Sequence, residues 1–280
     1  MDESKLRHPW EKPAFVAFSL LNAALVVVAV WGVELSADWV EKFPHLEQIG
    51  NWVRAAGAAL LAGIPAIAIG RAIRMMSMSK RAIRVTATQF PELYGLIEGL
   101  SAKLGMKAPP LYLSDELSGY RARAYSAFRR GYAILIKPES MEAQLVRNLD
   151  VSAFDLAREL GRIRMGHTAW YADFLLSVTQ AVPYLSNPIR HLRTYSQDSY
   201  GAYLVENAMP GLAFYATGRR LIRTVDYEEL RRQWEEPLSG MDRLASLTVA
   251  VPALAMRYQR LRDLGLIQVR RDNVVEGIIA

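Results

Sequence analysis

The hydrophobic pattern of the chain begins with one long apolar run. Residues 15–33 read FVAFSLLNAALVVVAVWGV and contain no charged residue. A helix rises about 1.5 Å per residue, so this run is long enough to cross a hydrocarbon core of about 30 Å. A signal peptide is the alternative, but the run is long for the apolar part of one, and no clear small-residue cleavage site follows. We therefore predict a membrane span over residues 15–33.

A second apolar run, residues 55–70, reads AAGAALLAGIPAIAIG and lies between two arginines. It is slightly short for a span, but both arginines can extend their charged ends to the membrane interface. Its small residues, which include Gly57, Gly63 and Gly70, allow another helix to approach closely. A buried core helix is the alternative. Because charges flank the run at both ends, we predict that it pairs with the first run as an N-terminal two-helix transmembrane hairpin.

The remainder of the chain is predicted to be mostly α-helical with a small β-sheet. In PELYGLIEGLSAKLG, leucines at positions 93, 96, 100 and 104 recur every three or four residues, which indicates an amphipathic helix. The short apolar runs in PPLYLSD and GYAILIKP predict strands at about 110–115 and 131–137. Further helices are predicted at about 141–166, 197–222, 226–236 and 240–264. The chain is thus divided into a membrane anchor, residues 1–84, and a folded domain, residues 85–280.

The distribution of charge places this domain on one side of the membrane. Residues 34–53, between the two apolar runs, carry four acidic residues and one lysine, whereas residues 71–84 carry five basic residues and no acidic one. The positive-inside rule therefore predicts a multi-pass protein of the inner (cytoplasmic) membrane, with the N-terminus and the folded domain in the cytoplasm. The five basic side chains are expected to contact anionic lipid head groups: Arg71, Arg74, Lys80, Arg81 and Arg84.

Composition limits the chemistry of the domain. Hydrophobic residues make up 51% and charged residues 22% of the chain, which suits a few membrane spans attached to a soluble part. There is no cysteine, which excludes disulfides and cysteine-based zinc or nucleophile sites. With four histidines (His8, His45, His167 and His191), a metal site would be built mainly from carboxylates, which suit zinc poorly. The net charge of +6 is too small for a nucleic-acid-binding surface, so we expect no such partner.

Five short segments follow one another in an order that is typical of one protein family. They are PELY at residue 91, PPLYL at 109, RELGR at 158 with its continuation IRMGHT, QDSYGA at 197, and AVPALAMRYQRLRD at 250. Together with the apolar hairpin, they resemble the HtpX-like integral-membrane zinc peptidases, a group that includes the CAAX prenyl proteases. Each motif is degenerate, and RELGR alone would indicate an ordinary amphipathic helix. The ordered set covers nearly the whole chain, and it implies a zincin-like metallopeptidase domain.

The resemblance implies which residues occupy the active-site positions. In the family, two histidines at positions i and i+4 of one helix bind zinc, and the glutamate beside the first accepts a proton from the zinc-bound water. Here Arg158 and Arg162 stand at the two histidine positions, and Glu159 keeps the glutamate position. Asp198 stands at the position of the third, acidic ligand. Three further positions depart from the family pattern: Arg123 replaces a strand asparagine, Ala202 an acidic residue, and Val251 the histidine before a proline.

Arginine cannot replace histidine as a zinc ligand. Its guanidinium stays protonated and offers donors but no lone pair. We therefore expect no zinc and no peptidase activity in this chain. Loss of the cation would leave Glu159 and Asp198 as neighbouring buried carboxylates, which is costly. We predict that Arg158 or Arg162 supplies the missing positive charge by forming a salt bridge with Asp198.

The leading hypothesis is a catalytically inactive, membrane-anchored homologue that acts as a structural or accessory subunit of a larger membrane complex. Its partners would be other integral membrane proteins, bound through the two spans and the cytoplasmic domain. Two alternatives stay open: a membrane-bound endopeptidase in protein quality control with an atypical site that uses Glu159, and a regulator of an active peptidase. An arginine-lined cavity could also bind an anion.

Residues 168–185, TAWYADFLLSVTQAVPYL, form a third apolar stretch. A single crossing here would place Asp198 on the opposite side of the membrane from Arg158, which is incompatible with the predicted salt bridge. The segment could instead lie in the membrane interface, with Trp170 and Tyr171 at the level of the head groups, or line a groove. The sequence leaves these possibilities open.

Overall fold

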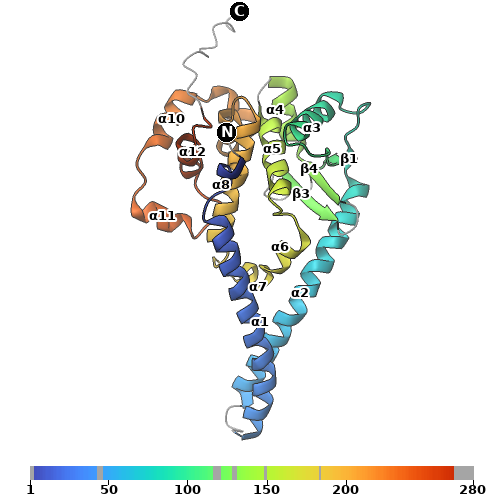
Figure 1. Cartoon of the computed structure of the whole chain (residues 1–280), viewed down its shortest axis with the longest axis vertical. Helices are drawn as coiled ribbons and strands as arrows, with labels where there is room; N and C mark the ends of the chain where they lie inside the picture. Colours follow the sequence, from blue (N-terminus) through green and yellow to red (C-terminus); the bar gives the residue numbers. More distant parts are fainter. Residues whose placement is uncertain are drawn as a thin grey trace, which may run out of the picture.

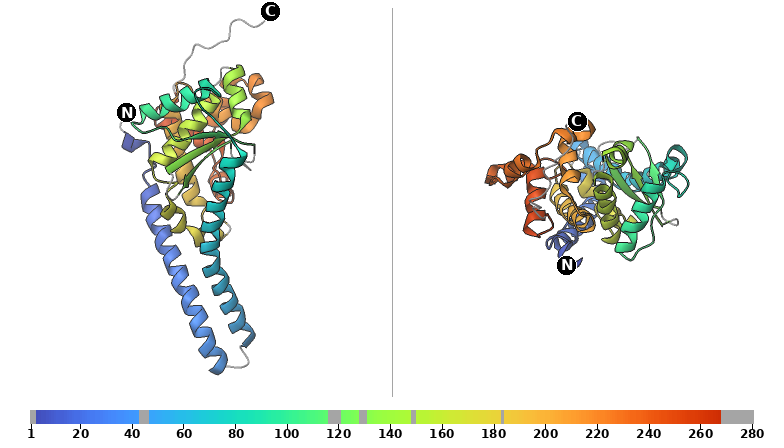
Figure 2. Two further views of the ribbon diagram at one scale, coloured as in Figure 1. Left: turned by 90° about the vertical axis from the view of Figure 1, so that its right-hand side faces the viewer. Right: turned by 90° about the horizontal axis from the view of Figure 1, so that it is seen from above.

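Two long helices dominate the outline of the molecule. The computed structural model describes residues 3–42, 47–115, 121–127, 131–147, 150–182 and 184–267. Within these ranges, α1 (Glu11–Lys42) and α2 (Glu47–Arg81) lie against each other and project from a body that holds the other elements (Figure 1). A view turned by 90° shows the same two helices as a narrow stalk below the body (Figure 2). A short 3-10 helix, η1 (Glu3–Lys5), precedes α1 and packs on the body, where the adjacent Leu6 is fully buried.

The surface of α1 is apolar and largely exposed. Leu20, Val28 and Trp31 expose 67%, 65% and 63% of their areas. Over Glu11–Glu34, α1 is long and apolar enough to cross a membrane, and it is the one helix in the described part of the chain that meets this criterion. The prediction of an N-terminal apolar helix is confirmed at this level. The second predicted span, residues 55–70, lies within α2 and stays a prediction.

A small residue brings α1 and α2 together at one point. A Cβ atom on Gly57 would lie 2.7 Å from Cγ2 of Val33 and 2.8 Å from the carbonyl oxygen of Ala29, so the two helices touch too closely there for any side chain. The prediction that Gly57 permits close helix packing is confirmed. A Cβ on Gly63 or Gly70 would meet no described atom within 4 Å, so the same prediction for these two glycines stays a prediction.

The body contains a four-stranded mixed sheet with the order β1-β2-β4-β3. Its strands are β1 (Ile83–Arg84), β2 (Leu111–Leu113), β3 (Ala122–Ala127) and β4 (Gly131–Ile136). β2 and β4 run parallel, and the other two pairs are antiparallel. The predicted strands at 110–115 and 131–137 are confirmed as β2 and β4. β1 is only two residues long and has no periodic signal in the sequence.

Two apolar cores hold the body together. The first lies between α3 (Pro91–Lys103), the sheet and α5 (Val151–Arg164), with Leu93, Ile134 and Leu160 almost fully buried. The second joins α5 to α9 (Met209–Leu221), α10 (Tyr227–Glu235) and α12 (Leu254–Asp263), and it includes Phe154 and Tyr258. The body is therefore mostly helical with a small sheet, as predicted. A zincin-like relationship stays a prediction.

Three predicted helices are each divided in two. The helix predicted over 141–166 corresponds to α4 (Pro138–Arg147) and α5. The helix predicted over 197–222 corresponds to the end of α8 (Asn187–Leu204) and to α9. The helix predicted over 240–264 corresponds to α11 (Gly240–Ser246) and α12. Proline explains two of the breaks, because it favours the first turn of a helix and disrupts a helix interior. Pro210 stands in the first turn of α9, and Pro252 lies just before α12. A 3-10 turn, η3 (Ile222–Thr224), follows α9, and the predicted helices at 91–105 and 226–236 match α3 and α10.

α6 (Trp170–Phe174) and α7 (Ser177–Ala181) form a loop that leaves the end of α5 and returns to the start of α8. The loop lies between α1 and α2, and α7 contacts both (Figure 1). The side-chain oxygen of Asn22 in α1 accepts a hydrogen bond of 2.7 Å from the backbone N–H of Val178. Residues 168–185 are therefore not a single crossing, and the helices before and after them lie side by side in the body.

Candidate functional site

The candidate site is built on one charged face of α5. Arg158 and Glu159 are neighbours in sequence, and each lies three or four residues from Asp155 and Arg162, which places all four on the same side of the helix. Nearly every residue of α5 is buried, including three of these four. Charges in such a position need partners within the protein, because an unpaired buried charge is strongly unfavourable.

Asp198 of α8 is held between two arginines from different helices. Arg257 of α12 donates from Nε to Oδ2 at 2.6 Å and from Nη2 to Oδ1 at 2.9 Å, a bidentate pair. Arg158 of α5 places its Nε 2.6 Å from Oδ1 of the same carboxylate. The Asp198 and Arg257 side chains are each 1% exposed, and that of Arg158 is 11% exposed. We call these three residues the arginine clamp.

The electrostatics of the clamp favour its charged form. Burial acts to raise the pKa of the Asp198 carboxyl, but the positive charges of Arg257 and Arg158 outweigh this and hold that pKa below its usual value. Burial also acts to lower the pKa of Arg158, yet Tyr215, Asp198 and Asp155 together raise it. The clamp is therefore an ion pair at any physiological pH.

The clamp belongs to a larger cluster that also contains Arg121, Asp155 and Tyr215. The ring of Tyr215, on α9, lies at the centre of this cluster. The guanidinium carbons of Arg121, Arg257 and Arg158 lie 3.5, 4.4 and 5.2 Å from its centroid, which is the range of cation–π contacts. The Tyr215 hydroxyl accepts a hydrogen bond from Nη1 of Arg158 and donates one of 3.4 Å to Oδ1 of Asp155. Tyr215 thus links the clamp to a second buried carboxylate.

Asp155 is that second carboxylate. Its Oδ1 accepts a hydrogen bond of 2.6 Å from Nη2 of Arg121, and its Oδ2 accepts one of 3.0 Å from the Ser140 hydroxyl. Burial raises the pKa of Asp155 above its usual value, although Arg121 and Arg158 act against this. The same Nη2 of Arg121 also donates to the carbonyl oxygen of Gly211 at 2.9 Å, which connects α9 to the segment before β3.

Glu159 and Arg162 face the sheet instead of the clamp. Oε2 of Glu159 accepts the backbone N–H of Ala124 on β3 at 2.6 Å, and Nη1 of Arg162 lies 3.6 Å from the same oxygen. The predicted salt bridge of Asp198 is therefore confirmed for Arg158, whereas Arg162, the other predicted partner, pairs with Glu159. The two arginines lie one helical turn apart on the same side of α5, but their side chains reach different partners, Asp198 for Arg158 and Glu159 for Arg162.

The other three predicted positions do not join the cluster. Ala202 is buried in the second apolar core near Phe154. Val251 lies in the segment before α12 and is 52% exposed. Arg123 lies on β3 opposite Leu135 of β4. Of the predicted set, the structure thus brings together Arg158 and Asp198. Glu159 and Arg162 lie on the same helix as Arg158.

Sequence reasoning missed four members of the cluster: Arg121, Asp155, Tyr215 and Arg257. Asp155 could have been found, because it precedes Arg158 by three residues on the same helical face. Arg257 stands in the VPALAMR segment that contributes to the family resemblance, where an arginine is part of the pattern. No local signal identifies Tyr215 or Arg121, because their contacts arise only when α9 and the start of β3 pack on α5.

The clamp does not fit a zinc ion. Both oxygens of Asp198 are engaged by guanidinium groups, one oxygen of Glu159 is engaged by β3, and arginine has no lone pair to offer a metal. Across the described ranges, no three His, Asp or Glu side chains are grouped so as to hold a metal ion. These residues form ion pairs that join α5, α8 and α12, and hydrogen bonds and cation–π contacts of Tyr215 add α9.

Comparison of the chain with protein-family models, with curated proteins and with solved structures finds no match.

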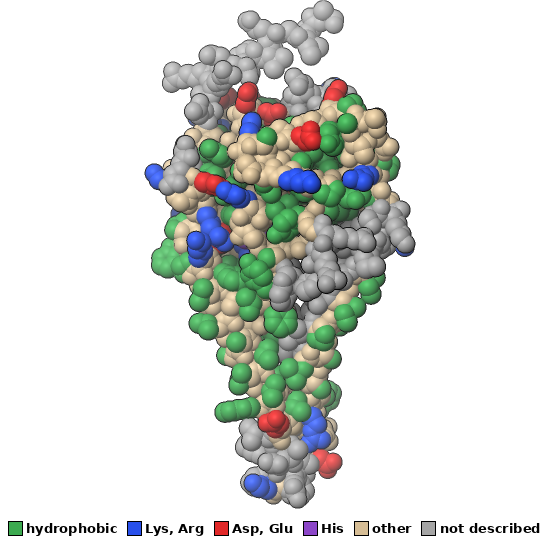
Figure 3. All heavy atoms as spheres, turned by 45° about the vertical axis from the view of Figure 1, so that its right-hand side comes forward, with side chains coloured by type: hydrophobic (Ala, Val, Ile, Leu, Met, Phe, Trp, Pro, Cys, Tyr) green, Lys and Arg blue, Asp and Glu red, His purple; other side chains and the backbone are tan. Residues whose placement is uncertain are grey.

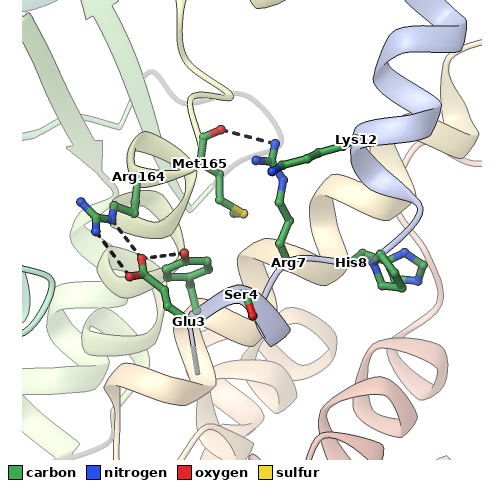
Figure 4. Close-up of a pocket in the computed structure, with 9 residues that line it drawn as sticks. Glu3, Ser4, Arg7, His8, Lys12, Arg164 and Met165 are labelled. Carbon is green, nitrogen blue, oxygen red and sulfur yellow. Dashed lines mark hydrogen bonds and ion pairs between the residues drawn. The ribbon is translucent and has the colours of Figure 1, made fainter. Parts of the chain in front are cut away.

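A cavity of about 380 Å³ lies apart from the clamp, between the N-terminal segment and the end of α5 (Figure 4). Glu3 accepts hydrogen bonds of 2.9 Å from Nε of Arg164 and from the Tyr200 hydroxyl. Arg7 reaches toward the carbonyl oxygen of Met165 at 3.5 Å. None of the sequence-predicted site residues lines this cavity.

A second buried polar cluster ties the start of α1 to the body. Glu11 is 1% exposed, and its carboxylate accepts hydrogen bonds from Nε2 of His167 at 2.6 Å, from Arg7 at 2.7 Å and from the Ser196 hydroxyl. The other ring nitrogen of His167, Nδ1, has no hydrogen-bond partner among the described residues. The ring is thus suited to the neutral form, with its single proton directed at Glu11.

This cluster predicts acid sensitivity of the fold. Burial lowers the pKa of His167 to about 4, against the opposing effect of Glu11, while Arg193 and Arg162 add to the lowering. In the unfolded chain the ring titrates near its ordinary value of 6.5. The stability from neutral His167 is therefore complete above pH 6.5 and is lost as the pH falls toward 4, by an amount on the order of 3 kcal/mol.

Thermal unfolding in detergent at pH 7.5 and pH 4.5 measures this loss. Glutamine at position 167 can still donate to Glu11 but does not titrate, so His167→Gln is expected to lose clearly less stability than the wild type between the two pH values. Parallel losses in the two proteins would show that His167 does not carry the acid sensitivity.

Proposed function

We propose that this chain is a membrane-anchored, catalytically inactive relative of the HtpX-like zinc peptidases and serves as a structural or accessory subunit of a larger membrane complex. The observation that carries the proposal is the arginine clamp. Arg158 stands at a zinc-ligand position of the family pattern, and its Nε lies 2.6 Å from Asp198, at the position of the third ligand. In this proposal, a guanidinium holds the place that a divalent cation holds in active relatives.

The charges of the clamp support this replacement. A buried Asp198 without a cation would be a strongly destabilising unpaired charge. Arg158 and Arg257 supply positive charge from within the chain, and both are hydrogen-bonded or in ion-pair contact at ordinary distances. The helices that would surround a metal are thus held together without one, so the fold can be kept while its chemistry is absent.

The surroundings of Glu159 weigh against the rival hydrolase. A general base must lie within hydrogen-bonding reach of the proton that it removes. Glu159 is 4% exposed, and one of its oxygens is bound to the Ala124 N–H at 2.6 Å. Such a carboxylate is better suited to fasten α5 to the sheet than to activate a water molecule.

Anchoring in the membrane is part of the proposal. The length and apolar composition of α1 support one span, and residues 55–70 of α2 would form the second, giving a multi-pass protein of the inner membrane. The basic residues that follow the second span would place the body in the cytoplasm and contact anionic lipid head groups. The stalk and the body would then both be available to other integral membrane proteins.

The substitution Glu159→Gln distinguishes the structural role from a hydrolytic one. Glutamine keeps an acceptor oxygen for the Ala124 N–H but cannot act as a general base. We expect no turnover of a fluorogenic unfolded casein by the purified full chain, with or without added zinc, in either wild type or variant. In native gel electrophoresis of solubilised membranes, we expect both proteins to migrate in the same large complex.

Asp198→Asn is the opposing control, because it removes the charge that the clamp needs and should deplete the complex. Casein turnover that disappears in Glu159→Gln, or stoichiometric zinc that disappears in Asp198→Asn, would identify a working metallopeptidase and overturn the proposal. Migration of the wild type as a single chain would overturn the role as a subunit.

A further inference from the structure

The first observation concerns the depth of the α6–α7 loop along α1. Asn22 lies seven residues after Phe15, where the apolar run begins, which corresponds to about 10 Å along a helix axis. Its side chain is 6% exposed and accepts the Val178 N–H at the start of α7. If α1 crosses a bilayer from Phe15 onward, α7 reaches into the leaflet that adjoins the body.

The loop is built in a way that suits this depth. Polar backbone groups in the hydrocarbon region must be satisfied within the protein. Asn22 supplies the acceptor for the first turn of α7, and the hydroxyls of Ser177 and Thr179 donate to the carbonyl oxygens of Phe174 and Leu176 at 2.8 and 3.0 Å. This also explains why a single amide stands in an otherwise apolar run. Large apolar side chains of the loop point outward and are exposed by 42–67%: Tyr171, Phe174, Val182 and Tyr184.

The second observation is an apolar surface on α11 and the segment after it. Its members are exposed by 39–73%: Met241, Leu244, Leu247, Val249 and Val251. The backbone of this segment is fixed to the first turns of α8, because Asn187 donates to the carbonyl oxygen of Leu247 at 2.7 Å and His191 bonds that of Val249 at 2.9 Å. α8 begins where the α6–α7 loop ends, so the segment lies at the stalk end of the body.

We propose that these two surfaces form a membrane-seated rim: the α6–α7 loop and residues 241–251 lie in the cytoplasmic leaflet of the bilayer that α1 crosses. The proposed occupant is lipid. This inference rests on the membrane anchoring proposed above and extends it from the stalk to the body.

Continuity with α1 argues for lipid as the occupant. The exposed apolar surface of α1 begins at Val16, and Figure 3 shows hydrophobic side chains gathered along the stalk and where it meets the body. Two exposed basic side chains lie beside the rim, Lys12 at the start of α1 and Arg190 on α8, and within it the exposed Arg243 stands next to Asp242 on α11. Apolar residues at the acyl boundary with basic residues at the level of the phosphates are the arrangement of interfacial membrane segments.

The absence of cysteine from the chain makes a direct test possible. Single cysteines would be placed on the rim at Leu244→Cys and Val182→Cys, on the stalk at Leu20→Cys, and on the far side of the body at Glu92→Cys in α3. Each full-length protein would be labelled with an environment-sensitive fluorophore and reconstituted into vesicles of phosphatidylcholine and phosphatidylglycerol, with and without lipids that carry a shallow or a deep nitroxide quencher.

We expect both rim labels to lose roughly half or more of their fluorescence with the shallow quencher and less with the deep one, because interfacial segments lie about 5–10 Å below the surface. The Leu20 label should be quenched, and the Glu92 label should not.

Rim labels that behave like the Glu92 label, while the Leu20 label is quenched, would overturn the rim and leave the anchoring intact. An unquenched Leu20 label would overturn the anchoring itself. Rim labels protected from aqueous iodide yet insensitive to both lipid quenchers would show that protein covers the surface, which also contradicts the proposal.

Discussion

Replacing Asp198 with alanine is expected to lower the free energy of unfolding by about 3–5 kcal/mol, the largest loss from any single carboxylate of the body. The substitution removes the partner of Arg257, which is 1% exposed, and of Arg158, which is 11% exposed, so two guanidinium groups lose their counter-charge at once. Chemical denaturation of the detergent-solubilised protein, followed by tryptophan fluorescence, would measure the loss.

Two comparisons make this result specific. Arg158→Met should cost less than Asp198→Ala, because the bidentate pair of Asp198 with Arg257 survives. Asp263→Ala removes a carboxylate that is 61% exposed and pairs with the neighbouring Arg262, so stability should be nearly unchanged. If Asp198→Ala proved as mild as Asp263→Ala, the clamp would not be a main support of the fold.

Gly161→Ala is expected to destabilise the packing of α5 on α8. A Cβ at this position of α5 would lie 2.4 Å from Cβ and 2.6 Å from Cγ of Tyr200 on α8, which is far below van der Waals contact. Neither atom is the free end of a flexible side chain, so α5 and α8 must move apart. Overpacking of this kind costs about 1–3 kcal/mol and sometimes more. Because the displaced helices carry Arg158 and Asp198, the clamp should loosen as well.

Gly95→Ala provides the matched control on α3. No atom lies within 4 Å of the Cβ that it would add, and Gly95 is an exposed residue inside a helix. Alanine there should raise stability by about 0.5–1 kcal/mol, because glycine is the weaker helix former. Equal effects of the two substitutions on the denaturation midpoint would contradict the close contact of α5 with α8.

The elements that the sequence predicts well are those with a strong local signal. The apolar run of 15–33 identifies α1, and the leucine spacing of PELYGLIEGLSAKLG identifies α3. The division of predicted long helices is less visible, because helical periodicity continues across the breaks and only Pro210 and Pro252 mark two of them. β1 could not be anticipated, since a two-residue strand exists only through its pairing with β2.

The candidate site was predictable where a sequence pattern placed charged residues at related positions. The pairing of Arg158 with Asp198 was predicted from the resemblance of the RELGR and QDSYGA segments to metal-site motifs, together with the need to neutralise a buried carboxylate. The role of Arg257 was not predicted: an arginine in the VPALAMR segment marks the position, but nothing in the sequence shows that it pairs with Asp198, 59 residues earlier. Val251 shows the opposite error. Its position in a motif predicts a place in the candidate site, but its side chain, in the segment before α12, is exposed to solvent.

The contacts of Glu3 and Glu11 with α8 have a consequence for the order in which the protein assembles. Glu3 bonds Tyr200, 197 positions away, and Glu11 bonds Ser196, 185 positions away. At about 5–20 residues per second, roughly 10–40 s of synthesis separate Glu3 and Glu11 from these partners. The apolar helix α1 leaves the ribosome long before α8 exists, so it emerges while Glu11 still lacks His167 and Ser196. Glu3 and Glu11 are thus made long before their partners, and their contacts can form only after α5 and α8 have been synthesised.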